Sequence, residues 1–470
     1  MRDNKITKVG GTTRYNPTAL TNKIPYVKRS YHKRGDGTFV KRTICFSNGS
    51  FYSGNDVTGA LTLAQGGFPT NAIPTDLTFQ VSGNSILYSF TGLETPYKYD
   101  GNGSYTFERT TLDADIMAAV EHLDRVFYIK NNSSDLDYSE EITPETIEDT
   151  ILIGNAQDSI NIAVVKGAND TIYIFKNNSI YELLGRTPSS FQARCITTKY
   201  GLASKRAICA VGSGFIFLNE FDKELYFFGG SESSIMNLTE ADIRLREIID
   251  TTYDSIESVC MAVHNGLFRF AFKHRESPID SNNCELIYCI TEPQADGKPK
   301  WSLVKGSNVL SYAVMNQQGD SNELLTGRSD IGCLMYHNRG WDFDSTAIET
   351  IVRTAEVVVS EDMVHDFLDF FIKAKPGHYS LNAIFKYFLN GRYSIGASSN
   401  LSVRGETRDV GSIHLSNSSL LNDRIVPLCN YRRGNSISFE IYENNGGTEL
   451  EFYSIAFKSL PKYIIRNQYV

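Results

Sequence analysis

Histidine and cysteine are the residue types with which this chain could bind a metal or act as a nucleophile, and their spacing favours neither. The eight histidines form no H-x-x-x-H or H-E-x-x-H pair, and no neighbouring cysteine completes a zinc quartet. The sequence also lacks a G-x-S-x-G elbow and a glycine-rich phosphate loop. We therefore predict no catalytic, cofactor-binding or metal-binding residues and no enzymatic activity. Each histidine is interpreted as a surface residue or a hydrogen-bonded interior one: His32, His122, His264, His274, His337, His365, His378 and His414.

The eight cysteines lie mostly inside apolar runs and form no C-x-x-C pair. This pattern predicts buried free thiols. The alternative is a disulfide framework, which a chain of this length does not need. The residues concerned are Cys45, Cys195, Cys209, Cys260, Cys284, Cys289, Cys333 and Cys429.

Two acidic segments leave a weaker possibility of chemistry. Asp342-Phe343-Asp344 could hold Ca²⁺ with nearby carbonyl groups, but an EF-hand loop with its Gly and Glu is missing, so a solvated acidic turn is favoured. Ser329-Asp330 resembles the start of a sialidase Asp-box, yet no Thr-Trp completes it and it is not repeated. Some β-propellers are glycosidases. If the chain folds as a propeller, as its strand pattern predicts below, glycan binding or glycan cleavage is therefore one alternative for its function.

Short strands recur along the chain and predict how it folds. Residues 170–185 comprise two strands joined by Lys-Asn-Asn-Ser, and related runs are bounded by Gly, Asn, Asp or Ser. The markers of these runs are Leu87, Phe127, Ile174, Phe217, Phe268 and Leu325. Their spacing of roughly 40 to 57 residues is close to that of four-stranded propeller blades. We predict an all-β fold with a β-propeller of about six blades, and a pair of β-sandwiches is the alternative.

Three segments follow from this pattern. Residues 1–37 lack periodicity and are predicted to form a basic N-terminal arm, residues 38–347 the propeller, and residues 348–470 a C-terminal β-sandwich with longer alternating strands. An inter-blade helix is expected at Leu238–Tyr253, capped by Thr239, and a weaker one at Pro144–Asp149. The loop at 443–448 predicts that the last two strands form a hairpin.

Charge divides the chain into a basic start and an acidic body. Residues 1–42 hold eleven Lys or Arg against Asp3 and Asp36, a net charge of +9, so the remainder carries −17 of the total of −8. A body of this charge argues against gripping nucleic acid through its phosphates. The arm could dock on an acidic partner or touch nucleic acid, or it could become a strand of a neighbour or of its own first blade. No apolar run of 18 residues and no secretory signal is present, so we expect no membrane segment and synthesis in a cytoplasm.

Several of these segments, taken in order, resemble one family. They are Phe39–Thr43, Tyr97–Gly101, His122–Tyr128, Tyr138-Ser139 with Pro144, Ile172–Gly185, Tyr200–Ser204, Gly214–Leu218, Ile243–Ile249, Lys300-Trp301, Leu325–Gly327, Asp330–Gly332 and Tyr431–Gly434. Each segment alone is common, and their order and spacing give the likeness, which extends over nearly the whole chain. It is similar to the β-propeller structural proteins of short-tailed bacteriophages, the packaged-DNA stabilisation, tail nozzle or tail hub family.

The resemblance implies a non-enzymatic virion protein, made in the host cytoplasm and assembled in the tail as a homohexameric ring below the head-to-tail adaptor or portal. Such a ring extends the DNA channel and helps to retain the genome until ejection, without sequence-specific binding to the DNA that passes. Other tail proteins (fibre, spike or needle) would be partners. The arm and Lys458, Lys462 and Arg466 become candidate contacts, so deleting residues 1–30 should impair attachment and leave the propeller folded. An intracellular scaffold that binds peptides is a third hypothesis.

Overall fold

The chain forms two compact units, Arg14–His337 and the combination of Met1–Thr13 with Asn338–Val470. The computed structural model describes residues 6–7, 11–100, 107–154, 160–239, 243–290, 301–314, 323–337, 342–348, 350–353, 357–359, 363–376, 381–389, 392–403, 422–427, 433–434, 436–443 and 450–464. Nearly all of the regular structure is β. No helix among these residues is long and apolar enough to cross a membrane.

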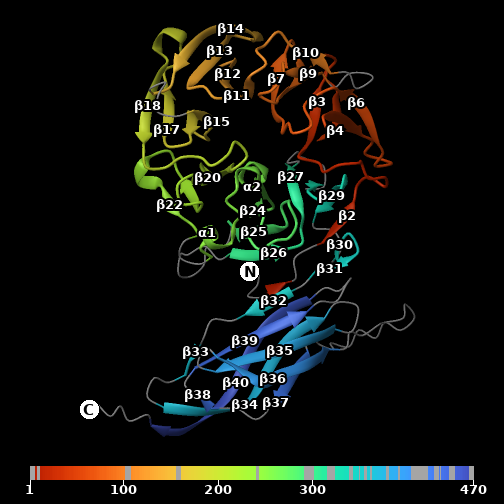
Figure 1. The fold of residues 1–470 in the computed structure, drawn as a ribbon, viewed down its shortest axis with the longest axis vertical. Coiled ribbons are helices and arrows are strands. Elements are labelled where there is room, and N and C mark those ends of the chain that lie inside the picture. The colour runs from red at the N-terminus through yellow and green to blue at the C-terminus, as the bar shows by residue number, and fades with distance from the viewer. Residues whose placement is uncertain are drawn as a thin grey trace. The chain divides into compact units, whose positions relative to one another are not determined.

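The unit Arg14–His337 is a seven-bladed β-propeller. Each of the first six blades is an antiparallel sheet of four strands in sequential order, and the seven blades follow one another around a ring (Figure 1). Blade one contains β3 (Tyr26–Lys33), β4 (Phe39–Ser47), β5 (Ser50–Gly54) and β6 (Leu61–Gly66). Blade two contains β7 (Thr75–Val81), β8 (Asn84–Phe90), β9 (Tyr97–Tyr99) and β10 (Glu108–Arg109). Blade three contains β11 (Ile116–His122), β12 (Arg125–Lys130), β13 (Asp135–Glu140) and β14 (Thr143–Leu152).

The next three blades repeat this arrangement. Blade four contains β15 (Asn161–Lys166), β16 (Ile172–Lys176), β17 (Ile180–Leu184) and β18 (Gln192–Thr197). Blade five contains β19 (Ile208–Val211), β20 (Gly214–Leu218), β21 (Leu225–Phe228) and β22 (Met236–Asn237). Blade six contains β23 (Cys260–His264), β24 (Leu267–Phe272), β25 (Cys284–Cys289) and β26 (Trp301–Lys305). The described helices are short: α1 (Leu245–Ile248), α2 (Tyr253–Ser258), and the 3₁₀ turns Pro188–Ser190 and Glu232–Ser234.

Blade seven closes the ring with strands from both ends of the unit. It joins β27 (Val309–Val314), β28 (Leu324–Arg328) and β29 (Leu334–His337) to β2 (Thr12–Arg14). The chain then continues alongside this blade, because the Tyr15 N–H donates to Leu334 O at 2.8 Å and the Ile24 N–H to Arg328 O at 3.0 Å. Closure of this kind ties the two ends of the ring together and leaves only short, protected strand edges.

The predicted count of about six blades is wrong, and the missing blade is the first. All six marker residues lie in the second strand of blades two to seven, whereas the equivalent strand of blade one is β4. The neighbouring strand β3 carries Lys28, Arg29 and Lys33, and for this reason its sequence looks like part of a basic arm. The alternative, a strand in the chain's own first blade, is what the structure has for Tyr26–Lys33.

Aromatic and aliphatic side chains fill the space between adjacent blades. One cluster joins blades four, five and six, and in it Phe175 and Phe228 meet edge to face with ring centroids 5.7 Å apart. Other clusters join blades one and two, two and three, three and four, six and seven, and seven and one. Full burial of such a side chain contributes about 1.5–3 kcal/mol. The radial packing that the sequence predicts is therefore the main source of the propeller's stability.

Both predicted helices are corrected. Residues 143–152 form the strand β14, because Pro144 starts a run with β-branched residues that pairs with β13. No single helix spans Leu238–Tyr253. The strand β22 ends just before this segment, and the one-turn helix α1 lies within it. Arg244 has a φ of 51°, which prevents α1 from extending backwards. Thr239 does not cap a helix, since its hydroxyl donates to the buried Glu224 at 2.5 Å.

The second unit contains two antiparallel sheets. In one sheet β40 (Leu450–Ile464) pairs with both β1 (Ile6–Thr7) and β34 (Met363–Pro376), and β34 also pairs with β37 (Asn422–Pro427) and β38 (Arg433–Gly434). In the other, β39 (Ser436–Glu443) pairs with β32 (Thr350–Arg353), β33 (Val357–Val358) and β35 (Leu381–Leu389), and β35 with β36 (Arg392–Val403). The hairpin β30 (Asp342–Phe343) and β31 (Thr346–Ala347) belongs to the same unit.

The prediction that the last two strands form a hairpin is wrong. β39 and β40 belong to different sheets. β40 pairs along its whole length with β34, from Leu450 opposite Pro376 to Ile464 opposite Met363. The predicted arm also enters this unit, since Ile6 lies opposite Phe452. Residues 1–37 thus supply β1 to this sheet and β2 and β3 to the propeller.

Gly59 offers a direct test of how closely the N-terminal segment packs on blade one. Its φ is +70°, and a Cβ there would lie 1.9 Å from Tyr15 O. Gly37 has a similar φ of +83°, but nothing lies within 4 Å of the Cβ that an alanine would add there. We expect Gly37→Ala to cost about 1–2 kcal/mol from backbone strain alone, and Gly59→Ala to lower the melting temperature considerably more. Equal melting temperatures would contradict the close approach.

Candidate functional site: an axial cavity

A cavity of about 840 Å³ lies at one end of the propeller axis. Every blade or the connection before it contributes to its lining, which places it on the axis instead of between two blades. Inter-blade connections supply Pro25, Ala72, Ala203 and Ile256, and Leu93, Asn131, Asn177, Lys223, Lys273 and Leu310 come from the blades themselves. Such connections and the turns after the second strands share one face of a propeller. The cavity therefore opens on that face.

Two of the cavity's lysines are neutralised by carboxylates. Lys223 Nζ lies 2.7 Å from Glu220 Oε2, and Lys273 Nζ lies 2.9 Å from both Asp250 and Asp280. The pKa of Asp250 falls to about 2, first because it accepts the Thr252 N–H and further because Lys273 is close. The bonds to Asp280 and Asp250 in turn raise the pKa of Lys273. These positions are stable ion pairs and do not present free charge to a ligand.

Lys205 has a different environment in the same cavity. Its ammonium donates to the backbone carbonyl of Ile73 at 2.9 Å, and no carboxylate forms an ion pair with it among the described residues. Burial lowers the pKa of Lys205 to about 8, although Glu257 acts in the opposite direction. Burial also raises the pKa of Glu257, against the effect of Lys205 and Arg206.

Uncharged polar groups make up much of the remaining lining. Asn71, Asn131, Asn132 and Asn177 all border the cavity. The amide oxygen of Asn177 and the hydroxyl of Ser281 are buried without a hydrogen-bond partner in the described structure. Buried polar atoms are ordinarily satisfied by protein or water, so these atoms indicate that the cavity is wet or receives a polar group.

A second group of polar residues is buried between blades six and seven. Arg269 Nη1 lies 3.4 Å from Glu285 Oε1 and 3.0 Å from His337 Nε2, and the Tyr312 hydroxyl donates to Glu285 at 2.6 Å. Because a guanidinium only donates, His337 Nε2 must accept, so this histidine is neutral. Burial lowers the pKa of His337 to about 4. Burial raises the pKa of Glu285, but the Arg269 guanidinium and the hydrogen bond from Tyr312 outweigh it, so the pKa of Glu285 is lowered and the carboxylate stays ionised.

A third group ties blade seven to blade one. Arg29 Nη1 lies 2.5 Å from Glu323 Oε2, and its Nη2 lies 3.4 Å from Asp56 Oδ1. Asp56 also accepts the hydroxyls of Tyr15 at 2.9 Å and Thr43 at 2.8 Å. The side chain of Arg29 is 2% exposed, so the charge is fully desolvated and depends on these partners.

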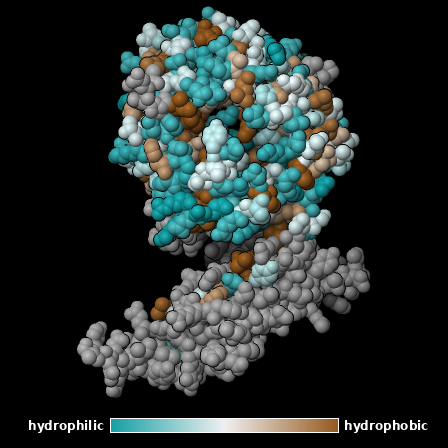
Figure 2. Space-filling view, in the orientation of Figure 1, coloured by the Kyte–Doolittle hydropathy of each residue, from teal (hydrophilic) through white to brown (hydrophobic). Residues whose placement is uncertain are grey.

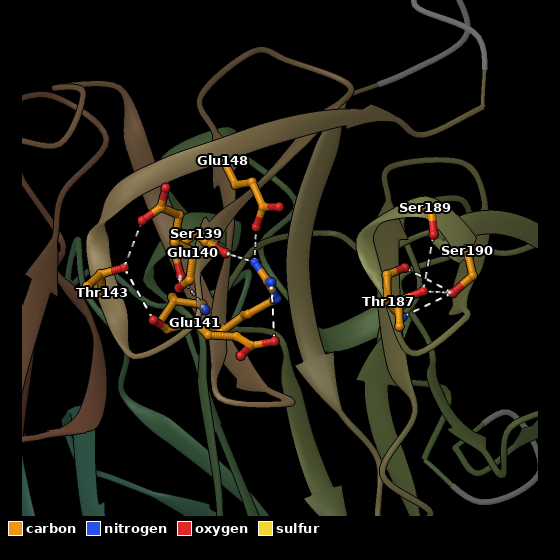
Figure 3. A network of polar contacts seen from close by, with 10 residues as sticks. Ser139, Glu140, Glu141, Thr143, Glu148, Thr187, Ser189 and Ser190 are labelled. Atoms are coloured by element: carbon orange, nitrogen blue, oxygen red, sulfur yellow. Dashed lines mark hydrogen bonds and ion pairs between the residues drawn. The ribbon is translucent and has the colours of Figure 1, made fainter.

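On blade three, the carboxylates of Glu140, Glu141 and Glu148 lie close together (Figure 3), and the last two pair with Arg125. Its guanidinium bonds Glu148 and the Ser139 carbonyl, and Nη2 lies 3.3 Å from Glu141 Oε1. Glu140 is engaged through Thr143, whose hydroxyl lies 3.5 Å from its carboxylate. Within the described part of the chain, no three His, Cys, Asp or Glu side chains could hold a metal ion. The cluster fixes the β13–β14 turn.

The residues considered from sequence are spread over the molecule. His32, His122, His264 and His337 are buried, and His378 and His414 lie outside the described residues. Asp330 pairs with Arg328 at 2.5 Å in a turn, and Asp342 begins the hairpin β30–β31. Cys45, Cys260 and Cys284 are buried free thiols as predicted and Cys333 is also buried, whereas Cys195 is exposed and Cys429 lies outside the described residues. Sequence reasoning missed Lys205 and Glu257, which no motif marks.

No protein-family model and no curated protein matches the sequence. Among solved structures, the chain is similar to the extracellular domains of two putative hybrid two component systems from B. thetaiotaomicron. These are BT4673, with 10% sequence identity and a TM-score of 0.45, and BT3049, with 9% identity and a TM-score of 0.47. The chain is also similar to BBS1N in complex with ARL6DN, with 10% identity and a TM-score of 0.42. These alignments cover 76%, 89% and 71% of this chain. The chain spans 43% and 57% of the two extracellular domains and 97% of BBS1N. Likenesses at these TM-scores carry no argument about function.

Proposed function

We propose that the protein is a structural component of a bacteriophage tail, a nozzle or hub ring below the head-to-tail adaptor that extends the DNA channel and helps to retain packaged DNA. The observation that carries this proposal is where the buried charged side chains lie and which partners they have within the fold. Arg29 and Arg269 connect neighbouring blades, and Lys223 and Lys273 are neutralised by adjacent carboxylates. Such an arrangement favours a rigid part over a catalyst.

The surface supports the same role. The visible face of the propeller is mostly hydrophilic, with apolar side chains scattered among polar ones (Figure 2). Beyond residue 42 the chain carries a net charge of −17. A surface of this kind repels phosphate over a Debye length of about 8 Å at physiological salt. DNA would slide past such a protein without sticking, and partners such as adaptor, fibre, spike or needle proteins would have to hold it back.

The two C-terminal sheets are proposed to pack face to face as a β-sandwich. Ile437, Phe439 and Ile441 on β39 are each at most 3% exposed. The strands that pair with β39 lie beside it in the same sheet, so they do not cover the face that carries these side chains. Apolar side chains on one face of a sheet need a second layer to cover them. Lys458 and Lys462 on β40 are the proposed contacts with the adaptor or with neighbouring subunits, together with Arg466, which lies outside the described residues.

The mass of the purified full chain tests the ring. We expect a closed assembly, most simply of six copies, with a central channel in negative-stain images. A chain that stays monomeric at all concentrations would contradict the proposal.

The amide-rich axial cavity favours a second candidate, a glycan-binding or glycan-cleaving propeller. Saturable oligosaccharide binding that is lost in Asn177→Leu would support that candidate.

A further inference from the structure

The starting observation is the position of Lys205 in the axial cavity. It lies in the connection between blades four and five, where the Ala207 N–H donates to Ser204 O at 3.0 Å and fixes a tight turn. Its ammonium reaches across to Ile73 O, in the connection between blades one and two. The amine is therefore held at a defined point of a cavity of about 840 Å³, which is large enough for a small organic molecule.

Two other lysines of this cavity provide a contrast. Lys223 and Lys273 each contact a carboxylate at 2.7–2.9 Å, and such a partner stabilises the protonated amine. Lys205 donates to a neutral carbonyl oxygen, a weaker stabilisation of the ammonium. Lys205 is half-buried, and an amine that is partly removed from water and has no ion-pair partner loses its proton more readily than an exposed one. With a pKa of about 8, close to half of Lys205 is neutral at that pH and carries a free electron pair.

A proton donor borders the same cavity. Glu257 lies on α2 and lines the cavity, and its carboxylate forms no ion pair with any described residue. The charged groups that act on Lys205 are Glu257 and the adjacent Arg206. Glu220 on blade five acts on Glu257 and, with burial, favours its protonated form. The pKa values of both groups are shifted so that the neutral form is favoured, and two such groups in one cavity are typical of functional sites.

We infer that Lys205 is a nucleophilic amine that captures a small aldehyde or ketone as an imine in the axial cavity, with Glu257 as the proton donor. The amine nitrogen attacks the carbonyl carbon, and a proton moves from nitrogen to oxygen to give a carbinolamine. Loss of the hydroxyl as water, with a proton from Glu257, leaves a protonated imine. One carbonyl and one amine thus give one imine and one water, without any oxidation or reduction. This inference does not rest on the proposed tail function.

Reductive trapping of the full-length protein tests this. The protein is incubated with limiting glycolaldehyde and cyanoborohydride between pH 6 and 10, and the modified lysines are quantified by peptide mapping. At pH 8 an ordinary lysine is less than about 1% neutral. We expect Lys205 to be alkylated about tenfold faster than Lys223 and Lys273, with a half-maximal rate near pH 8. A rate at Lys205 no higher than at those two internal controls would overturn the inference.

Two variants separate the roles of the residues. Glu257→Gln should slow imine trapping at Lys205 and leave its acetylation by an N-hydroxysuccinimide ester intact, because acetylation needs no proton donor. Equal slowing of both reactions, or of neither, would refute the role of Glu257. Lys205→Met should abolish fast trapping and Lys223→Met should preserve it. If Lys205→Met does not fold, the comparison of the three lysines within the wild-type protein still decides the outcome.

Discussion

Deletion of residues 1–30 is expected to abolish the folded propeller. The deletion removes β2, the fourth strand of blade seven, and most of β3, the first strand of blade one. It also removes Tyr15, Ile24 and Val27, each at most 5% exposed in the cluster between these two blades. Burial of each such side chain contributes about 1.5–3 kcal/mol. Their combined loss is comparable with the total of about 5–15 kcal/mol by which a domain is stable.

The deletion also leaves charges without their partner. Arg29 is the buried cation between Glu323 and Asp56, and in its absence both carboxylates remain in a largely desolvated place. The structure thus reverses the expectation that an arm-less chain keeps its propeller. Any loss of adaptor attachment in such a protein would follow from unfolding.

Thermal melting and limited proteolysis measure this result. Deletion of residues 1–10 is the matched control, because it keeps Thr12–Arg14 and everything after it. We expect the short deletion to retain the protease-resistant fragment that corresponds to Arg14–His337, and the long deletion to lose it. A cooperative transition at the wild-type temperature after deletion of residues 1–30 would show that blade seven does not need its N-terminal strand.

Much of the fold could be predicted from sequence because blades are local structures. Runs such as 172–185 contain two strands and their turn, and Ile172–Lys176 pairs antiparallel with Ile180–Leu184 across that turn. Blade one was missed because its inner strand carries charges, among them the buried Arg29. The partner that makes this charge tolerable, Glu323, is 294 residues away, and no local pattern reveals such a distant pairing.

The same limit explains the C-terminal error and the missed cavity. A Gly-rich turn predicts a hairpin from local geometry, but β40 finds its partner in β34, which lies about 90 residues earlier. Lys205 and Glu257 are 52 positions apart and line one cavity only because their two inter-blade connections both reach it. No motif encodes that juxtaposition. Function-bearing residues in a ring of repeats are thus less predictable than the repeats themselves.

The second large effect is expected at Glu285. Its carboxylate is 0% exposed and compensates the equally buried Arg269, while Tyr312 and His337 complete the network. Glu285→Gln keeps the shape of the side chain but removes the negative charge that faces the buried guanidinium of Arg269. Breaking a buried pair in this way costs about 3–5 kcal/mol, so we expect a large fall in the free energy of unfolding. Glu247→Gln, in the exposed pair with Arg244, is the control and should change little.

A double variant decides whether this loss is due to the unpaired charge or to the loss of stabilisation by the pair itself. Arg269→Met with Glu285→Leu removes both charges and fills the space with apolar groups. Because two desolvated ions cost nearly as much as their attraction returns, we expect the double variant to be more stable than Glu285→Gln alone. Additive destabilisation in denaturant unfolding would instead mean that each residue acts independently. In that case the charges between blades six and seven would stabilise the ring directly, and the fold would depend on them as it depends on its aromatic core.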